Sequence, residues 1–124
     1  MKVFKCTKCN NMISYLEKDA CDVKCCGETM VELVPNTTDA AGEKHVPVIE
    51  VSGNIVTVKV GSVEHPMTEA HSIQWIAIET EQGRQRKILT PDDKPEATFA
   101  LVEGDKVKEA YEYCNLHGLW KAEV

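Results

Sequence analysis

The sequence predicts an all-β protein in which a small cysteine-rich module precedes an antiparallel β-sandwich. Short apolar segments recur at intervals of roughly ten residues and are separated by turn formers, which is typical of sandwiches. No window shows a sustained helical period. Five of the six cysteines lie within the first 26 of the 124 residues, where apolar side chains are too few to form a core without a metal.

The elements follow in chain order. Residues 1–34 mix short apolar pieces with cysteines, and residues 35–44, "PNTTDAAGEK", indicate a polar linker or long loop. Strands are expected at Val46–Ser52 and Ile55–Val60, which flank the hairpin signal Gly53-Asn54. Further strands are expected at residues 72–80, 85–90, 96–102 and 106–113, with glycines and prolines between them.

Composition narrows the class of partner. The formal net charge of −6 disfavours nucleic acid and anionic membrane surfaces, because neither can be neutralised by an acidic chain. The start, Met1-Lys2-Val3-Phe4-Lys5-Cys6, has no apolar run of signal-peptide length, and no later segment reaches the length of a membrane span. We therefore expect a cytoplasmic protein with no membrane partner.

The first group of chemically active residues is the pair Cys6 and Cys9 together with the pair Cys25 and Cys26. A Cys-x-x-Cys turn presents two thiolates to one metal, and a second pair completes a tetrahedron suited to zinc or iron. The second pair is adjacent, so both thiolates reach one ion only if the backbone bends there. Gly27 permits such a bend.

Other uses of these cysteines stay open. Disulfides would be expected if the protein were exported, whereas a reducing compartment favours metal ligands. A thiol-disulfide oxidoreductase is disfavoured, since its Cys-x-x-Cys motif opens a helix in a βαβ unit. Cys21 is surplus to a four-thiolate site and is interpreted as a spare or partly buried thiol.

The second group comprises the chain's four histidines and its last cysteine. Each histidine alone would more often be solvated or hydrogen-bonded than a ligand. Cys114 and His117, however, stand at a chelating Cys-x-x-His spacing, and Pro66 keeps His65 out of helical geometry. If the loops converge, one thiolate and four imidazoles surround an ion and leave one position open (His45, His65, His71, Cys114, His117).

Taken together, these motifs resemble the superoxide reductases, specifically the two-iron desulfoferrodoxin type. The resemblance covers essentially the whole chain. It is carried by "FKCTKC" from Phe4, "CCG" from Cys25, "EKHVPVIE" from Glu43, "HPM" from His65, "IQWI" from Ile73 and "EYCNLHGLWKAE" near the end.

The resemblance implies a desulforedoxin-like module at residues 1–35 and an immunoglobulin-like superoxide reductase domain at residues 36–124. It implies a first iron held by Cys6, Cys9, Cys25 and Cys26. It also implies a second, catalytic iron with four equatorial histidines and an axial cysteine, corresponding to His45, His65, His71, His117 and Cys114. Two departures are Cys21, where a non-cysteine residue is expected, and Leu119, where some members have a second histidine.

The implied reaction is the one-electron reduction of superoxide to hydrogen peroxide without release of dioxygen. Ferrous iron, one thiolate and four neutral imidazoles give a formal charge of about +1, which attracts an anion. Lys44 is expected to add to this attraction and to orient the water or proton delivered to the product. Glu43 is expected to ligate the ferric form. Without the resemblance, Glu43 and Lys44 would be interpreted as a solvated charge pair.

The resemblance further implies rubredoxin or a similar protein as electron donor, and a homodimer. The four-thiolate centre has two interpretations, a redox relay or a structural staple, and we favour the staple. Three rival functions stay open: a small electron-transfer protein, a zinc-binding interaction module, and a superoxide dismutase. The dismutase is opposed by the donating thiolate, because that enzyme must also oxidise superoxide.

Overall fold

The computed structural model describes residues 1–18 and 21–124. These residues fall into two compact units, Met1–Val34 and Pro35–Val124. The predicted module at residues 1–35 includes residues 19 and 20, which lie outside the described residues. Whether residues 1–35 and 36–124 are independent domains stays a prediction. Among the described residues, no helix has the length and apolar character needed to cross a membrane.

The unit Met1–Val34 consists of very short strands. A sheet with the order β2-β1-β5 is formed by β1 (Val3–Lys5), β2 (Met12–Ile13) and β5 (Val31–Leu33). A separate hairpin pairs β3 (Lys24–Cys25) with β4 (Glu28–Thr29). Among the described residues of Met1–Val34, the buried side chains are Val3, Cys6 and Met30. So small an apolar core needs a cross-link, as a metal site provides.

The unit Pro35–Val124 is an antiparallel β-sandwich, and all of its residues are described. One sheet has the order β10-β7-β6 and the other the order β12-β11-β8-β9. The strands are β6 (Pro47–Ser52), β7 (Ile55–Val60), β8 (Ile73–Thr80), β9 (Arg84–Ile88), β10 (Glu96–Ala100), β11 (Val107–Cys114) and β12 (Gly118–Glu123). The predicted all-β fold class is therefore confirmed, including the hairpin at Gly53-Asn54.

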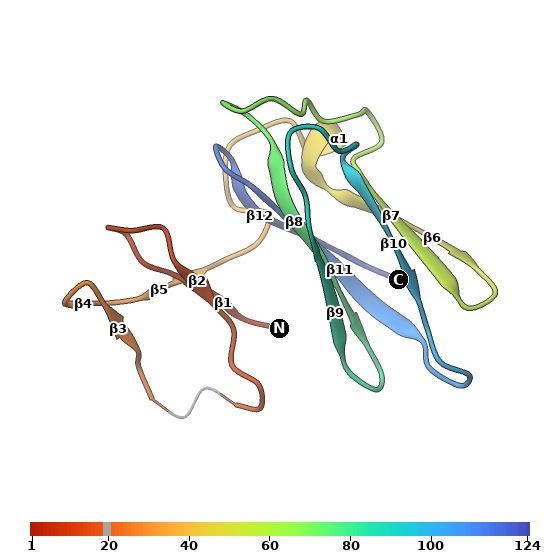
Figure 1. Ribbon diagram of the computed structural model, residues 1–124, viewed down its shortest axis with the longest axis horizontal. Coiled ribbons are helices and arrows are strands. Elements are labelled where there is room, and N and C mark those ends of the chain that lie inside the picture. The colour runs from red at the N-terminus through yellow and green to blue at the C-terminus, as the bar shows by residue number, and fades with distance from the viewer. Residues whose placement is uncertain (19–20) are drawn as a thin grey trace. The chain divides into compact units, whose positions relative to one another are not determined.

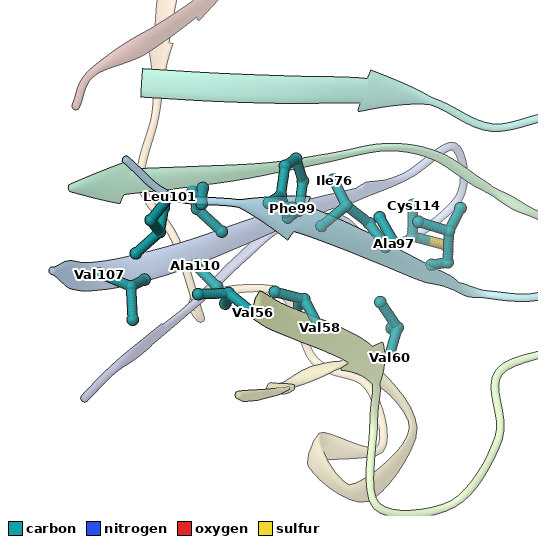
Figure 2. Packing of buried hydrophobic residues seen from close by; sticks show 12 residues of the cluster. Val56, Val58, Val60, Ile76, Ala97, Phe99, Leu101, Val107, Ala110 and Cys114 are labelled. Atoms are coloured by element: carbon teal, nitrogen blue, oxygen red, sulfur yellow. The ribbon is translucent and has the colours of Figure 1, made fainter. Parts of the chain in front are cut away.

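The sandwich core comes from side chains that alternate along the strands. Val56, Val58 and Val60 of β7 all point inward, as a period of two requires. They pack with Phe99 of the neighbouring strand β10 and with apolar side chains of β8 and β11 in the other sheet, among them Ile76. Figure 2 shows Cys114 at one end of this row of buried residues, beside Ala97 and Ile76.

In the unit Pro35–Val124, two elements were not predicted. The expected linker contains a single helical turn, α1 (Gly42–His45), which is too short to produce a sequence period. Strand β12 was not predicted, because in "GLWKAE" apolar and polar residues alternate only over the last four positions. It forms by pairing with β11 from Gly118 to Glu123. Asn36 borders β12, since its amide group donates to the carbonyl of Lys121 and accepts from its N–H.

The strand registers bring four connections to one end of the sandwich. Pro47 pairs with Val60, and Cys114 lies opposite both Ile73 and Gly118. The segments α1 to β6, β7 to β8, β9 to β10 and β11 to β12 therefore gather at this end, which is the upper end in Figure 1. Residues far apart in the chain meet there.

Candidate metal centres

Four thiols from two turns of the unit Met1–Val34 form the first cluster. Cys6 and Cys9 lie on the turn after β1, and Cys25 and Cys26 lie on the β3–β4 hairpin. Their sulfur atoms lie within 4.8 Å of one another, and Cys9 Sγ is 3.6 Å from Cys25 Sγ. Two sulfurs bound to one ion at about 2.3 Å each can be at most about 4.6 Å apart, which is close to the observed separations. The arrangement fits a single metal ion.

Backbone N–H groups of the first turn stabilise the thiolate form of Cys6. The N–H groups of Lys8 and Cys9 point at Cys6 Sγ, with N···S distances of 3.4 Å and 3.5 Å. Because these donors favour the thiolate, they lower the pKa of Cys6 to about 7. Such N–H···S contacts support a metal-binding thiolate.

The bend required by adjacent cysteines lies at Cys26 itself. Its φ is 54° and that of Gly27 is 78°. Positive φ at both central positions is typical of a type I′ hairpin turn, which here connects β3 to β4. The turn brings both sulfurs to the same cluster. Hydrogen bonds with the neighbouring thiols of Cys9 and Cys6 raise the pKa of Cys26 to about 12.

Cys21 lies apart from both metal-binding groups found among the described residues. Its thiol is exposed and free of a disulfide. Its carbonyl oxygen accepts a hydrogen bond of 2.6 Å from the hydroxyl of Tyr15. The structure thus gives this residue a backbone contact rather than a place beside the four clustered thiols.

The second cluster lies at the upper end of the sandwich and joins three connections. His45 ends α1, His65 and His71 lie between β7 and β8, and Cys114 and His117 lie at the turn from β11 to β12. Their ligand atoms all lie within 4.8 Å of one another. Trans ligands with bonds of about 2.1 to 2.3 Å are separated by roughly 4.2 to 4.6 Å, so these five atoms fit around one ion.

Hydrogen bonds to backbone carbonyls orient two of the four imidazoles, those of His45 and His65. His45 Nδ1 lies 2.8 Å from the carbonyl oxygen of Ala41, and His65 Nδ1 lies 2.7 Å from that of Pro66. A proton held on Nδ1 leaves Nε2 as the basic atom. Among the described residues, Nε2 of His65 and of His71 are buried without a hydrogen-bond partner. A buried nitrogen lone pair without a hydrogen-bond donor is suited to bind a metal ion.

Burial sets the charge state of these ligands. It lowers the pKa of His65 to about 4, and it also lowers the pKa values of His45 and His71. These three imidazoles are therefore neutral near pH 7, as metal ligands must be. Burial raises the pKa of Cys114, whereas the N–H groups of Leu116 and His117 act in the opposite direction. A bound cation would favour its thiolate.

Neighbouring side chains hold the ligand loops in place. The ring of Trp120 stacks on that of His45, with centroids 5.0 Å apart, and its Nε1 donates to the carbonyl oxygen of His117 at 3.0 Å. Asn115 connects two loops: its Oδ1 accepts from the N–H of Ser72 at 3.0 Å, and its Nδ2 donates to the carbonyl of Ala70 at 3.0 Å. These contacts flank His71. Sequence reasoning did not identify Trp120 or Asn115 as positioning residues.

Glu43 and Lys44 lie on α1 with exposed side chains. Their backbone is fixed by the start of the β7–β8 connection, because the carbonyl of Glu43 accepts from the N–H of Val63 at 2.9 Å. Gly61 permits this approach: a Cβ there would lie 2.4 Å from the carbonyl oxygen of Glu43. The charge of Lys44 is close enough to the cluster to lower the pKa of His71.

A buried acid near the second cluster was also missed. Glu112 is fully buried on β11, two residues before Cys114, and neither of its oxygens has a hydrogen-bond partner among the described residues. Burial raises its pKa to about 9, so it is neutral near pH 7. The alternation of β11 contained the signal, since Ala110, Glu112 and Cys114 share one face.

Comparison with known proteins agrees with this geometry. The model of the desulfoferrodoxin family matches residues 37–123. A desulfoferrodoxin from Syntrophotalea carbinolica is 51% identical over 124 residues, which cover 99% of this chain and 96% of that protein. One from Nitratidesulfovibrio vulgaris is 48% identical over 123 residues, with coverages of 99% and 96%. The crystal structure of the superoxide reductase from Treponema pallidum has a TM-score of 0.82 and 46% identity, covering 92% of this chain and 93% of that one.

Proposed function

Because the chain belongs to the desulfoferrodoxin family and its structure brings together the ligands of two metal sites, we propose that it reduces superoxide to hydrogen peroxide at its second site. The reaction is O2·− + e− + 2 H+ → H2O2, and the reducing electron comes from the site. The observation that carries the proposal is the convergence of four imidazoles and one thiol at one end of the sandwich. Two of the imidazole nitrogens are buried there and make no hydrogen bond among the described residues.

The donor set fits a redox-active iron better than a zinc ion. Structural zinc sites are closed and four-coordinate, whereas this cluster offers five ligands. Ferrous iron held there supplies one electron, which the thiolate makes easier to donate. The first site, with four thiols, fits an iron in tetrahedral coordination.

We propose that residues of this chain bring the anion to the site and supply its protons. The neutral imidazoles add no charge, so a ferrous ion and one thiolate leave about +1. Lys44 extends this positive field to the surface of α1 and holds the water that delivers a proton. Glu43, one residue earlier, provides a carboxylate for the oxidised site, because the harder ferric ion favours oxygen.

We also propose that the four-thiol site is a structural staple rather than an electron relay. The small number of buried apolar side chains in the described part of Met1–Val34 supports this role. When a site does not exist in the unfolded chain, metal binding contributes directly to folding.

Three further expectations complete the proposal. We propose a cytoplasmic location, supported by six cysteines with no disulfide among them. Rubredoxin or a similar small protein is proposed as the electron donor, and a homodimer as the assembly, both on family membership. Sedimentation of the iron-loaded protein and reduction by added rubredoxin would test the last two.

The decisive experiment measures both products. The iron-loaded, reduced protein is mixed rapidly with superoxide while an excess of donor keeps it reduced. We expect one hydrogen peroxide for each superoxide consumed and no dioxygen. A dismutase would give one peroxide and one dioxygen for every two superoxides, and a simple electron-transfer protein would not accelerate the decay. Either outcome would overturn the proposal.

A matched pair of variants tests the role of Lys44. Lys44→Gln removes the ammonium group beside the site, whereas Lys106→Gln removes the same charge from the β10–β11 connection at the opposite end of the sandwich. We expect Lys44→Gln to slow capture of superoxide, most strongly at low ionic strength, while Lys106→Gln leaves it unchanged. Equal rates in the two variants would contradict the role given to Lys44.

A further inference from the structure

A second lysine shares a cavity with Lys44 beside the histidine cluster. The cavity has a volume of about 560 Å³ and is lined by His65 and Pro66 from the β7–β8 connection and by Lys44 from α1. Lys94 contributes from the β9–β10 connection. Figure 1 shows this connection at the same end of the sandwich as α1. Residues separated by fifty positions in the chain therefore face one space next to a metal ligand.

The backbone that carries Lys94 is firmly held. The carboxylate of Asp93 accepts from the N–H of Thr90 at 2.7 Å and from its hydroxyl at 3.2 Å, which closes a turn. On the other side, the N–H of Val60 donates to the carbonyl of Pro95 at 2.9 Å and joins the connection to the end of β7. Lys94 thus extends from a fixed position.

The charged side chains around the cavity differ in whether they make hydrogen bonds. In the part of the chain that the structure describes, the ammonium groups of Lys44 and Lys94 make no hydrogen bond or ion pair. Of the two acids that line the cavity, Asp93 accepts hydrogen bonds from Thr90 in its own turn, which do not remove its charge. Glu64 makes no hydrogen bond or ion pair among the described residues, and together with Asp93 it opposes the charges of the two lysines.

We propose that Lys94 is a second residue that guides the anionic substrate, and that the cavity between Lys44 and Lys94 is the route by which a small monoanion reaches the histidine site. The inference rests on the proposed function for the identity of the anion, superoxide. Within the cavity, Glu64 has the opposite effect and lowers the local concentration of anions. The balance of these side chains sets the rate of capture.

The expected effects are modest and opposite in sign. A unit charge about 10 Å from a monoanion in water changes its local concentration about twofold at low ionic strength. Lys94→Gln is expected to halve the rate of superoxide capture at about 5 mM ionic strength, and Glu64→Gln to double it. Near 0.15 M, where the Debye length is about 8 Å, both differences should shrink.

The test compares Lys94→Gln, Glu64→Gln and Lys106→Gln in the full, iron-loaded chain. Lys106→Gln changes the net charge as Lys94→Gln does, but at the opposite end of the sandwich. Superoxide decay is followed after pulse radiolysis at both ionic strengths. Equal rates for Lys94→Gln and Lys106→Gln, or no increase for Glu64→Gln, would overturn the proposal.

A second measurement is independent of superoxide chemistry. The reduced protein is oxidised either by hexachloroiridate(IV), a dianion, or by tris(phenanthroline)cobalt(III), a trication, and the phase belonging to the histidine site is followed. Relative to Lys106→Gln, Lys94→Gln should slow the anionic oxidant and speed the cationic one. Equal rates of the two variants with both oxidants would refute the cavity's role. If wild-type protein fails to reduce superoxide but this reversal is seen, the proposed function fails and the anion route stands.

Discussion

Replacing Gly61 by alanine should separate two backbone segments that hold the second site. A Cβ at this position would lie 2.4 Å from the carbonyl oxygen of Glu43 and 2.9 Å from the carbonyl carbon of Lys44. Ordinary contacts begin at 3.4 Å, so the segments must separate by about 1 Å. Both atoms belong to the main chain, and no rotation of a side chain can relieve the overlap. The hydrogen bond from Val63 to Glu43 is weakened at the same time.

Overpacking of this kind costs about 1 to 3 kcal/mol. In a unit of this size, each kcal/mol lowers the melting temperature by about 4 to 8 °C. We therefore expect Gly61→Ala to melt at least about 5 °C below wild type when thermal unfolding of the iron-loaded protein is followed by circular dichroism. Iron in the second site should also be lost more readily, because His45 follows the displaced segment directly.

Gly83→Ala is the matched control. A Cβ at Gly83 would meet no atom within 4 Å, and its φ lies outside the left-handed region. Alanine there should leave the melting temperature within about 2 °C of wild type or raise it slightly, since it restricts the unfolded chain. Melting curves for Gly61→Ala and Gly83→Ala that coincide would refute the close contact between Gly61 and α1.

Three other changes separate the supports of the two sites. Asn115→Ala removes both side-chain bonds around His71 and should weaken metal binding at the second site about 10-fold to 100-fold in a chelator competition; unchanged affinity would exclude a positioning role. Trp120→Phe keeps an aromatic ring against His45 but loses a hydrogen bond, and should cost about 1 kcal/mol in denaturant unfolding, against about 3 to 5 kcal/mol for Trp120→Ala. If Phe and Ala cost the same, stacking contributes nothing. Cys9→Ser should empty the first site while superoxide reduction continues; loss of turnover with the second site still loaded would favour a relay.

Two pairs of ligands could be predicted from sequence because their spacing along the chain allows chelation, whereas His45, His65 and His71 were assigned through the family resemblance. Cys6 and Cys9, like Cys114 and His117, are close in the chain and reach one ion from a single turn. The resemblance to the desulfoferrodoxin type of superoxide reductase is confirmed by family membership. The bend between adjacent cysteines was also anticipated, although it was assigned to Gly27 and also involves Cys26, whose positive φ is uncommon outside glycine.

What sequence reasoning missed depends on tertiary contacts. Strand β12 alternates over only four residues and forms by pairing with β11. Glu112 is an acid at an inward position, and acids are rarely buried without a partner, so composition alone places it at the surface. The cavity shared by Lys44 and Lys94 depends on two connections meeting at one end of the sandwich. No local pattern encodes that meeting.

The closed apolar core of the sandwich has a consequence for how the two metals are acquired. Val58, Phe99 and their neighbours pack without help from any imidazole, so the strands that carry the second site can form while the chain is still empty of metal. The second site therefore forms before its ion binds, and the ions available in the cell then decide which one enters. If the first ion is instead bound as its surrounding chain folds, as proposed above, metal depletion should unfold Met1–Val34 while the sandwich keeps its fold and loses only its ion.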